Sequence, residues 1–446
     1  MKQPLNTVLQ AVEACRDTIL AAERHIWKNP ETGFREWKTH AYLAEKFEEL
    51  GYALTKAGDI PGFYTDLDTG RPGPKILIMA ELDALTAPNH PESWEGCAHA
   101  CGHHAQCAAM VGIALALKEP GALDGLSDSI RLMLVPAEEL IEVEYRNDLR
   151  RKGVISYLGG KVEFMHRGYM DGVDIAYLFH TRCNAKYVFD FNDSNGCMAK
   201  EITYVGKASH AGGSPHAGIN ALYAANMGLN AINAIRETFR DEDHVRVHPI
   251  LNVGNVAVNI IPPKADISTF VRGASMEVMA EANRKVDRAL AAGALAIGAK
   301  VHVVDQPGYA PFLNYPPLVE LADKVLGDLV GREEVGHLPW GTGSTDMGDV
   351  SCVIRTIQPH VGGASGTGHG DDYQLTDPDT ACIKSAQAQV LLAIALLEND
   401  AAEAKKIMAG PGPRYATMED YFKAIAMFDT ERDLVEYTED GAKVVF

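Results

Sequence analysis

The sequence predicts an α/β fold: a mixed, mostly parallel sheet with helices on both faces, and a smaller inserted α+β domain. Continuous apolar strands alternate with helices over the first third of the chain. The pattern changes near residue 198, and helical and strand segments resume after residue 306. Apolar strands between helices are typical of a parallel sheet covered on both faces. We therefore expect a main domain in two parts, 1–197 and 307–446, interrupted by an inserted domain at 198–306.

The apolar pattern predicts the elements of the main domain. Helices are expected at residues 7–26, 38–50, 105–118, 316–331 and 379–406. Strands are expected at residues 75–79, 130–135, 175–179 and 352–357. In a parallel sheet, binding sites form at the carboxyl ends of the strands. The tail, residues 409–446, opens with a Gly-Pro-Gly-Pro sequence and receives no assignment.

The inserted domain has a different pattern. Strands are expected at residues 199–206, 249–258, 265–273 and 301–304, and helices at 221–240 and 276–298. The order strand–helix–strand–strand–helix–strand is typical of a small α+β domain with an antiparallel sheet.

Composition excludes several classes of function. The chain is 46% hydrophobic and 23% charged, as in an ordinary globular protein, and its formal net charge is −19. A nucleic-acid partner is not expected, because no basic patch is present. The amphipathic N-terminus and the lack of a run of about 18 apolar residues argue against a signal peptide and a membrane span. Eight cysteines are too few for a disulfide scaffold in a chain of 446 residues, so we expect a cytoplasmic protein with reduced thiols.

The strongest chemical signal is the segment His99-Ala100-Cys101-Gly102-His103-His104. A thiolate and an imidazole two residues apart can bind one metal ion, and Gly102 between them permits a tight turn. The alternative is a buried cysteine beside surface histidines. The ligand types favour the metal.

Four further side chains are ambiguous when each is taken alone. Glu138 and Glu139 follow a predicted strand, where an exposed helix start is the simpler interpretation. His180 ends another strand, and His369 lies in a glycine-rich loop. Together with the first segment they make a set that suits two divalent ions sharing one ligand, with Glu138 left as a base; the five candidate ligands are Cys101, His103, Glu139, His180 and His369.

At this point the chain resembles the M20 metallopeptidases, and among them the amidohydrolase subfamily of aminobenzoyl-glutamate hydrolases, indoleacetyl-amino-acid hydrolases and aminoacylases. The His-Ala-Cys-Gly-His segment is highly specific to that subfamily, and the matches extend from residue 25 to about residue 373. The matching segments are His25-x-x-x-Asn29-Pro30-Glu31-Thr32-Gly33, Glu81-x-Asp83-Ala84-Leu85, His99-Ala100-Cys101-Gly102-His103, Pro136-Ala137-Glu138-Glu139, His180, Gly206-x-x-x-His210-Ala211, Asn259-x-Ile261-Pro262, Arg272, Gly343-Ser344-Thr345-Asp346 and His369.

The resemblance implies a zinc-peptidase-like catalytic domain with a dinuclear centre, Zn or Mn. Cys101 would bridge the two ions; Glu139 and His369 would complete one, and His103 and His180 the other. Asp83 would orient a ligand from outside the coordination shell. The chain departs from the subfamily twice, because Glu81 and His104 stand where aspartate is usual or frequent. The stretch 145–174 is also longer than the subfamily norm.

The resemblance further assigns a mechanism and the residues that bind substrate. Glu138 would act as general base toward a metal-activated water. His210, from the inserted dimerisation or lid domain, would stabilise the oxyanion across a homodimer, although a surface histidine is the simpler interpretation of its sequence alone. Arg272 and Asn259 would hold the substrate carboxylate, with a structural salt bridge as the alternative for Arg272, and Ser344 would also contact substrate.

The expected function is hydrolysis of the amide bond in small N-acyl or N-aroyl amino acids or dipeptides, with aminobenzoyl-glutamate-like substrates among them. One alternative is an M20-type dipeptidase, aminopeptidase or diamino-acid deacetylase, since a fold does not fix a function. A second is a metal-dependent binding protein without activity. Glu138 argues against that second alternative, because a binding protein needs no base beside its ligands.

Overall fold

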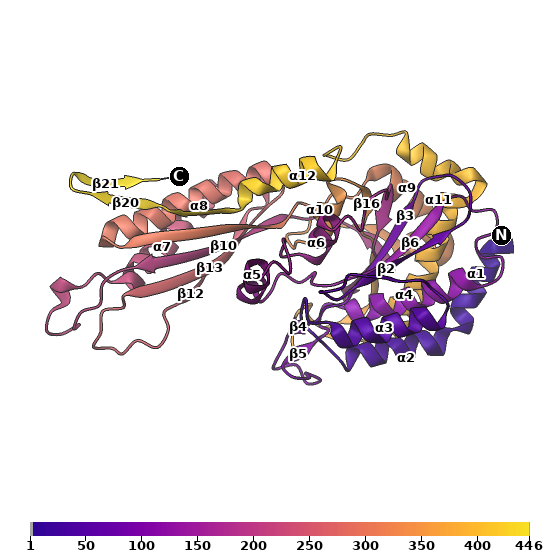
Figure 1. The fold of residues 1–446 in the computed structure, drawn as a ribbon, viewed down its shortest axis with the longest axis horizontal. Coiled ribbons are helices and arrows are strands. Elements are labelled where there is room, and N and C mark those ends of the chain that lie inside the picture. The colour runs from indigo at the N-terminus through magenta and orange to yellow at the C-terminus, as the bar shows by residue number, and fades with distance from the viewer. Residues whose placement is uncertain (1–2, 446) are drawn as a thin grey trace. The chain divides into compact units, whose positions relative to one another are not determined.

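The computed structural model describes residues 3–445 and divides into two compact units (Figure 1). The first unit comprises Met1–Asp193, Leu313–Pro339 and Asp349–Met418. The second comprises Ser194–Phe312, Trp340–Gly348 and Glu419–Phe446. The middle of the chain therefore folds together with a short internal segment and with most of the tail.

A six-stranded sheet forms the centre of the first unit. The strands β6, β3, β7 and β16 are parallel, and β2 and β1 extend the sheet as an antiparallel edge. Every residue of β3 and β6 is buried, as expected for strands covered on both faces. In sheet order the strands are β1 (Thr55–Lys56), β2 (Phe63–Asp68), β6 (Ser129–Val135), β3 (Ile76–Glu81), β7 (Ile175–Tyr177) and β16 (Arg355–Ile357).

Helices pack on this sheet and bury its apolar side chains. Helix α4 packs against β3, α6 against β6, and α9 against β16. The helices that lie wholly in the first unit are α1 (Gln3–Ala14), α2 (Arg16–Trp27), α3 (Trp37–Glu49), α4 (His103–Lys118), α5 (Val143–Arg151), α6 (Gly160–His166), α9 (Pro316–Val330) and α11 (Ser385–Met408), which follows a π-helical turn at Asp379–Lys384. The short α10 (Met347–Ser351) spans the boundary between the units. The α/β fold expected from the sequence is thus confirmed.

Two details of the helices differ from the sequence prediction. The predicted helix 7–26 is two helices, because the backbone turns at Cys15 and lets both α1 and α2 pack on α4. The segment Asp379–Met408 is long and apolar enough to cross a membrane, yet 78% of its most apolar window is buried inside the protein. Such burial is characteristic of a core helix.

A second, smaller sheet of the first unit carries His180 and the loop of His369. Its order is β15-β9-β17-β18, with β8 paired to β17. The predicted strand 175–179 accordingly ends at Tyr177, and a new strand begins at His180. The strands are β8 (His180–Cys183), β9 (Phe189–Phe191), β15 (Val335–His337), β17 (His360–Ser365) and β18 (Gln374–Leu375), while β4 (Leu85–Thr86) and β5 (Cys97–Ala98) form a separate hairpin.

The second unit is an antiparallel sheet with two long helices, as the sequence predicted. The sheet order is β11-β13-β10-β14-β19, and β12 also pairs with β13. Its elements are β10 (Gly196–Val205), α7 (Ala221–Ile235), β11 (Arg246–Val247), β12 (Ile250–Asn252), β13 (Lys264–Gly273), α8 (Met276–Ile297), β14 (Lys300–Tyr309) and β19 (Thr430–Asp433). The helix α12 (Met418–Ile425) precedes β19, and the hairpin of β20 (Val435–Thr438) and β21 (Gly441–Val444) follows it.

The tail is bound to the second unit by charge as well as by strand pairing. Arg432 on β19 forms ion pairs with Asp287 and Asp305, which lie on α8 and β14 and are buried. Lys200 on β10 contacts the same two carboxylates, at 2.7 and 2.5 Å. Buried carboxylates are costly without cations, so the tail helps to complete the charge balance of this sheet.

Candidate metal centre

The candidate ligands come from segments that follow neighbouring parallel strands. β3 ends at Glu81 and leads to Asp83, while β6 ends at Val135 and leads to Glu138 and Glu139. Since the carboxyl ends of parallel strands share one edge, these side chains converge. Gly102, with a φ of 94°, makes the turn into α4, which is a left-handed conformation suited to glycine.

The structure brings the five candidate ligands into two groups that share one thiol. Ligand atoms of Cys101, His103 and His180 lie within 4.8 Å of one another, and so do those of Cys101, Glu139 and His369. The Cys101 Sγ is 3.4 Å from the His180 Nε2, and the Glu139 Oε1 is 3.2 Å from the His369 Nε2. This arrangement can hold two divalent ions with Cys101 between them.

His103, which is buried, and His180, which is partly buried, are both oriented as candidate metal ligands. The Nδ1 of His103 lies 2.9 Å from the Asp83 carbonyl and 3.1 Å from its carboxylate, and the Nδ1 of His180 lies 2.8 Å from the Thr181 carbonyl. With a metal ion bound, donation from each Nδ1 would leave the Nε2 lone pair facing the site. Burial lowers the pKa of His180 to about 4, so its imidazole is neutral near pH 7.

Unsatisfied buried atoms support the fit of metal ions to these residues. Within residues 3–445, the His103 Nε2 and the Glu139 Oε1 make no hydrogen bond of good geometry, and their nearest partners are other ligand-type atoms, of Glu81 at 3.1 Å and His369 at 3.2 Å. Burial and the Glu139 carboxylate raise the pKa of the Cys101 thiol well above its usual range, and a bound divalent ion would displace that proton. Sulfur, nitrogen and carboxylate donors together suit transition metals such as zinc.

The candidate base lies against the same ligands. Glu138 is 6% exposed, and its Oε2 is 3.9 Å from the His103 Nε2. Glu81, His103 and Glu138 form a third group of ligand-type atoms within 4.8 Å. Asp83 accepts the backbone N–H of Glu139 at 2.8 Å, so this one carboxylate orients both His103 and the segment that bears Glu138.

The segment that carries the two glutamates is held by groups from far along the chain. Ala137 has a positive φ of 56°, and its N–H donates to the Glu36 carboxyl at 2.7 Å. Arg146 on α5 is completely buried and donates to the carbonyls of Ala137, Glu139 and Leu158. A left-handed alanine is strained, so these contacts are needed to keep it in place.

His369 reaches the centre from an exposed loop. Its φ is 64°, and its backbone N–H donates to the Ala100 carbonyl at 2.9 Å, which ties the loop to the segment of Cys101. The side chain is 55% exposed, in contrast to the other candidate ligands. The loop therefore delivers this histidine through a backbone contact.

Both departures from the subfamily pattern have buried partners. The Glu81 carboxylate accepts from the Lys161 ammonium at 2.5 Å and from Gln106 at 2.8 Å. His104 is also buried, with its Nε2 3.4 Å from a carboxylate oxygen of Glu23 on α2. Sequence reasoning missed Lys161. A buried glutamate in the motif requires a cation, and this requirement could have prompted a search for a buried lysine or arginine.

Comparison with known protein families gives a match that includes the candidate ligands. The model of peptidase family M20/M25/M40 matches residues 77–394, which include the candidate ligands and most of the chain. The chain belongs to this family. It is therefore a hydrolase of the peptidase and amidohydrolase type.

This M20 member is similar in sequence to two curated hydrolases and in fold to a solved structure. The human Xaa-Arg dipeptidase is 28% identical over 390 residues, covering 82% of this chain and 81% of the relative. The indole-3-acetyl-aspartic acid hydrolase of Enterobacter agglomerans is 25% identical over 398 residues, covering 75% and 84%. A dinuclear metal-binding M20 peptidase of Bacillus subtilis shares the fold, with a TM-score of 0.66 at 19% identity over 86% of this chain and 99% of that one.

The residues expected to bind substrate in this M20 protein all belong to the second unit. Arg272 on β13 donates to the Ser344 hydroxyl at 2.7 Å, so the structure brings these two together. His210 and Asn259 are exposed and lie on adjacent segments, because the Ala211 N–H donates to the Asn259 carbonyl at 2.8 Å. The structure thus brings Arg272 to Ser344, and the segment of His210 to that of Asn259.

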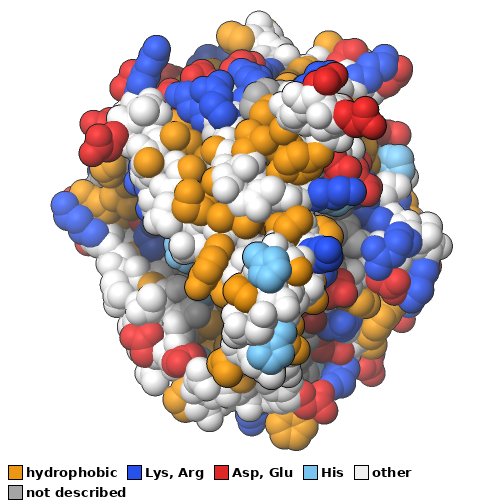
Figure 2. Space-filling view, turned by 90° about the vertical axis from the view of Figure 1, so that its left-hand side faces the viewer, with side chains coloured by type: hydrophobic (Ala, Val, Ile, Leu, Met, Phe, Trp, Pro, Cys, Tyr) orange, Lys and Arg blue, Asp and Glu red, His pale blue; other side chains and the backbone are white. Residues whose placement is uncertain are grey.

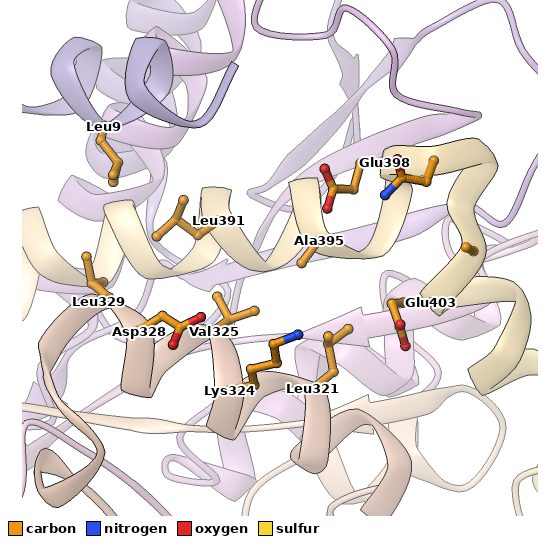
Figure 3. Close-up of a pocket in the computed structure, with 12 residues that line it drawn as sticks. Leu9, Leu321, Lys324, Val325, Asp328, Leu329, Leu391, Ala395, Glu398 and Glu403 are labelled. Carbon is orange, nitrogen blue, oxygen red and sulfur yellow. The ribbon is translucent and has the colours of Figure 1, made fainter. Parts of the chain in front are cut away.

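A large pocket of the first unit is separate from the metal centre. It has a volume of about 700 Å³ and lies between α9 and α11 (Figure 3). Leucine, valine and alanine side chains such as Leu321, Val325 and Leu391 form its apolar wall, and Asp328 and Glu403 lie among its polar groups. Its lining includes none of the candidate ligands. The pocket is therefore not the candidate active site.

Proposed function

We propose that this M20 hydrolase cleaves the amide bond of a small N-acyl or N-aroyl amino acid, or of a dipeptide, whose carboxyl-terminal residue has a free carboxylate. One observation carries the proposal: two groups of ligands share Cys101, and the buried Glu138 lies beside them. That set provides ligands for two ions together with a base, and hydrolysis of an amide by water can use both.

Two divalent ions held by Cys101, Glu139, His369, His103 and His180 would supply Lewis acidity, which lowers the pKa of water and polarises the amide carbonyl. Glu138 takes the proton of the attacking water and delivers it to the leaving nitrogen. General acid–base help of this kind contributes about a hundred- to ten-thousand-fold to the rate. Asp83 keeps His103 and the Glu138 segment in register during the reaction.

His210 has the hydrogen-bonding state that an oxyanion donor needs. Its Nδ1 accepts the backbone N–H groups of Gly212 and Gly213, at 3.1 and 2.9 Å. A neutral imidazole that accepts at Nδ1 carries its proton on Nε2. His210 is exposed, so this N–H can donate to the developing oxyanion of a substrate.

Arg272 is suited to anchor the substrate carboxylate. Within residues 3–445 its guanidinium contacts the Ser344 hydroxyl and the Phe270 ring, and no carboxylate pairs with it. A half-buried guanidinium without an anion is a ready partner for a carboxylate. The names of the two curated relatives describe a dipeptide with carboxyl-terminal arginine and an acylated aspartate, and both compounds have a free carboxylate.

The second unit has a surface suited to a homodimer. One edge of its sheet is covered by β19 from the tail, whereas β12 at the other side pairs only with β13 among the described residues. Apolar side chains are exposed on this unit, among them Tyr223, Met227, Ile250, Val258 and Ile260. Figure 2 shows apolar side chains gathered on one face of the protein. Open strand edges with apolar surroundings favour pairing with a second copy. Ile260 bridges to His210, so a partner would lie near that histidine.

Hydrolysis of N-acyl amino acids, of dipeptides and of the matching amino-acid amides tests the substrate class, with Zn, Mn and Co each supplied. We expect the acids to be cleaved and the amides to be poor substrates. Arg272→Ala should lower kcat/KM on acids by about 30- to 1,000-fold, the loss of a bidentate charged contact, with a much smaller effect on amides. Arg246→Ala is the matched control, because this exposed arginine lies opposite Arg272 on β11.

Two results would contradict the proposal. Wild-type protein that cleaves acids and amides equally well has no carboxylate anchor. If Arg272→Ala lowers kcat/KM by the same factor on acids and on amides, as Arg246→Ala also does, Arg272 has a structural role. A requirement for a free α-amine in the cleaved substrates would select dipeptidase or aminopeptidase action over acyl-amino-acid hydrolysis.

A further inference from the structure

The long stretch 145–174 contributes directly to the metal centre through α6. Its first residue, Gly160, donates its N–H to the Ala137 carbonyl at 3.1 Å. A Cβ atom at Gly160 would lie 1.6 Å from the Pro136 carbonyl oxygen, so only glycine allows this approach. The start of α6 is thereby fixed against the segment that carries Glu138, and Lys161 follows immediately.

Lys161 points from this fixed position into the centre. Its Nζ lies 2.5 Å from the Glu81 Oε1, and both side chains are completely buried. The other Glu81 oxygen accepts from Gln106 at 2.8 Å and lies 3.1 Å from the His103 Nε2. Glu81 therefore stands between an ammonium and the lone-pair nitrogen of a candidate metal ligand.

Glu81 is itself a competent metal ligand. Its carboxylate lies with His103 and Glu138 in a group whose ligand atoms are within 4.8 Å of one another. If Glu81 coordinated the ion held by His103, it would occupy a position that an amidohydrolase must leave open for its reactants. The chain consequently needs a means of keeping this carboxylate away from the ion.

We propose that Lys161 is a positioning residue that holds Glu81 outside the coordination shell and so keeps one position of the His103 ion open. This inference rests on the proposed function of the centre as a metal hydrolase. A buried carboxylate that loses its cation is strongly disfavoured and turns to the nearest remaining one. Without the ammonium, the cation nearest to Glu81 would be an ion bound by His103. Lys161 thus weakens metal binding, and in return it keeps a coordination position open for the reaction.

The test compares Lys161→Met with wild type in metal affinity, turnover and stability. Competition with a chromophoric chelator should show Zn and Mn bound about tenfold more tightly, because a buried positive charge next to the cations has been removed. Turnover should fall about tenfold or more with KM little changed, as expected when an interaction of the transition state is lost. The double variant Glu81→Gln, Lys161→Met carries neither charge and should return both quantities toward wild type.

Lys200→Met is the matched control. Lys200 is a second fully buried lysine, paired with Asp287 and Asp305 in the second unit. It should lose stability in denaturant unfolding without any tightening of metal binding. If Lys161→Met does not fold, Lys161→Gln provides the same comparison, since its amide retains a donor without the charge.

The outcomes separate this inference from the proposed function. Metal binding that weakens in Lys161→Met, or a double variant that recovers neither property, would overturn the positioning role. Tighter metal binding together with a wild-type protein that cleaves no amide substrate would support the role of Lys161 and reject the proposed function.

Discussion

The residue with the most sharply defined chemical task is Glu138. It is buried beside the ligand Glu139, and its carboxylate faces His103. Replacement by glutamine keeps the size of the side chain and removes its ability to take a proton. We expect Glu138→Gln to retain both metal ions, measured as metal content per chain, and to lose about a hundredfold or more in kcat with little change in KM.

Glu142→Gln is the matched control for that variant. Glu142 lies four residues after Glu138 and pairs with Arg35 outside the ligand groups. It should keep nearly full turnover. Near-normal turnover in Glu138→Gln would remove this residue from the mechanism, and loss of metal from it would assign Glu138 to coordination.

At the level of single residues, the candidate ligands could be predicted from their residue types, from their places after predicted strands or in adjoining loops, and from the resemblance to a family; the structure brings their ligand atoms together. Cys101 and His103 are two positions apart, and Glu139 lies four positions after the end of β6, so a short segment of chain determines where each points. Lys161 is 80 positions from Glu81, in a stretch with no periodicity that predicts its direction. Only the packing of α6 against the Glu138 segment shows that this lysine is buried.

The segment from Pro136 to Glu139 depends on helix α5. Arg146 on that helix donates to three backbone carbonyls around the segment while being fully buried. We expect Arg146→Met to reduce the free energy of unfolding by on the order of 3 kcal/mol, because buried carbonyls lose their donors. Denaturant unfolding of the metal-free protein measures this loss without a contribution from bound ions.

Arg151→Met on the same helix serves as the comparison. Its side chain is 66% exposed and pairs weakly with Asp148, so its removal should change stability by no more than about 0.5 kcal/mol. Equal effects of the two substitutions would mean that Arg146 does not stabilise the segment.

Among the elements, long apolar strands and helices were predictable and short or distant pairings were not. The buried strands β3 and β6 and the amphipathic helix α8 follow from patterns within one window of sequence. The tail could not be assigned, because β19 pairs with β14 across more than a hundred residues. Its alternation is masked by charged residues such as Arg432, which is needed for the buried aspartates of that sheet.

At the scale of the whole molecule, the proposed homodimer predicts that two copies share their sites. The candidate metal ligands and Glu138 belong to the first unit, and His210 belongs to the second. If His210 serves the site of its partner, chains lacking Glu138 and chains lacking His210 each supply what the other lacks. A mixed dimer of Glu138→Gln and His210→Ala then contains one complete site and one site with both defects.

Mixing the two inactive variants in equal amounts therefore has a defined expectation. Random exchange makes half of the dimers mixed, each with one complete site, so activity should return to about a quarter of wild type for a C2 dimer. Native mass spectrometry establishes that mixed dimers have formed, and each variant exchanged with itself is the control. Mixed dimers that stay inactive would place His210 in the site of its own chain, whereas a His210→Ala variant that is active by itself would remove His210 from the reaction. Recovery would require His210 from one copy and Glu138 from the other, because no homodimer of either variant contains both.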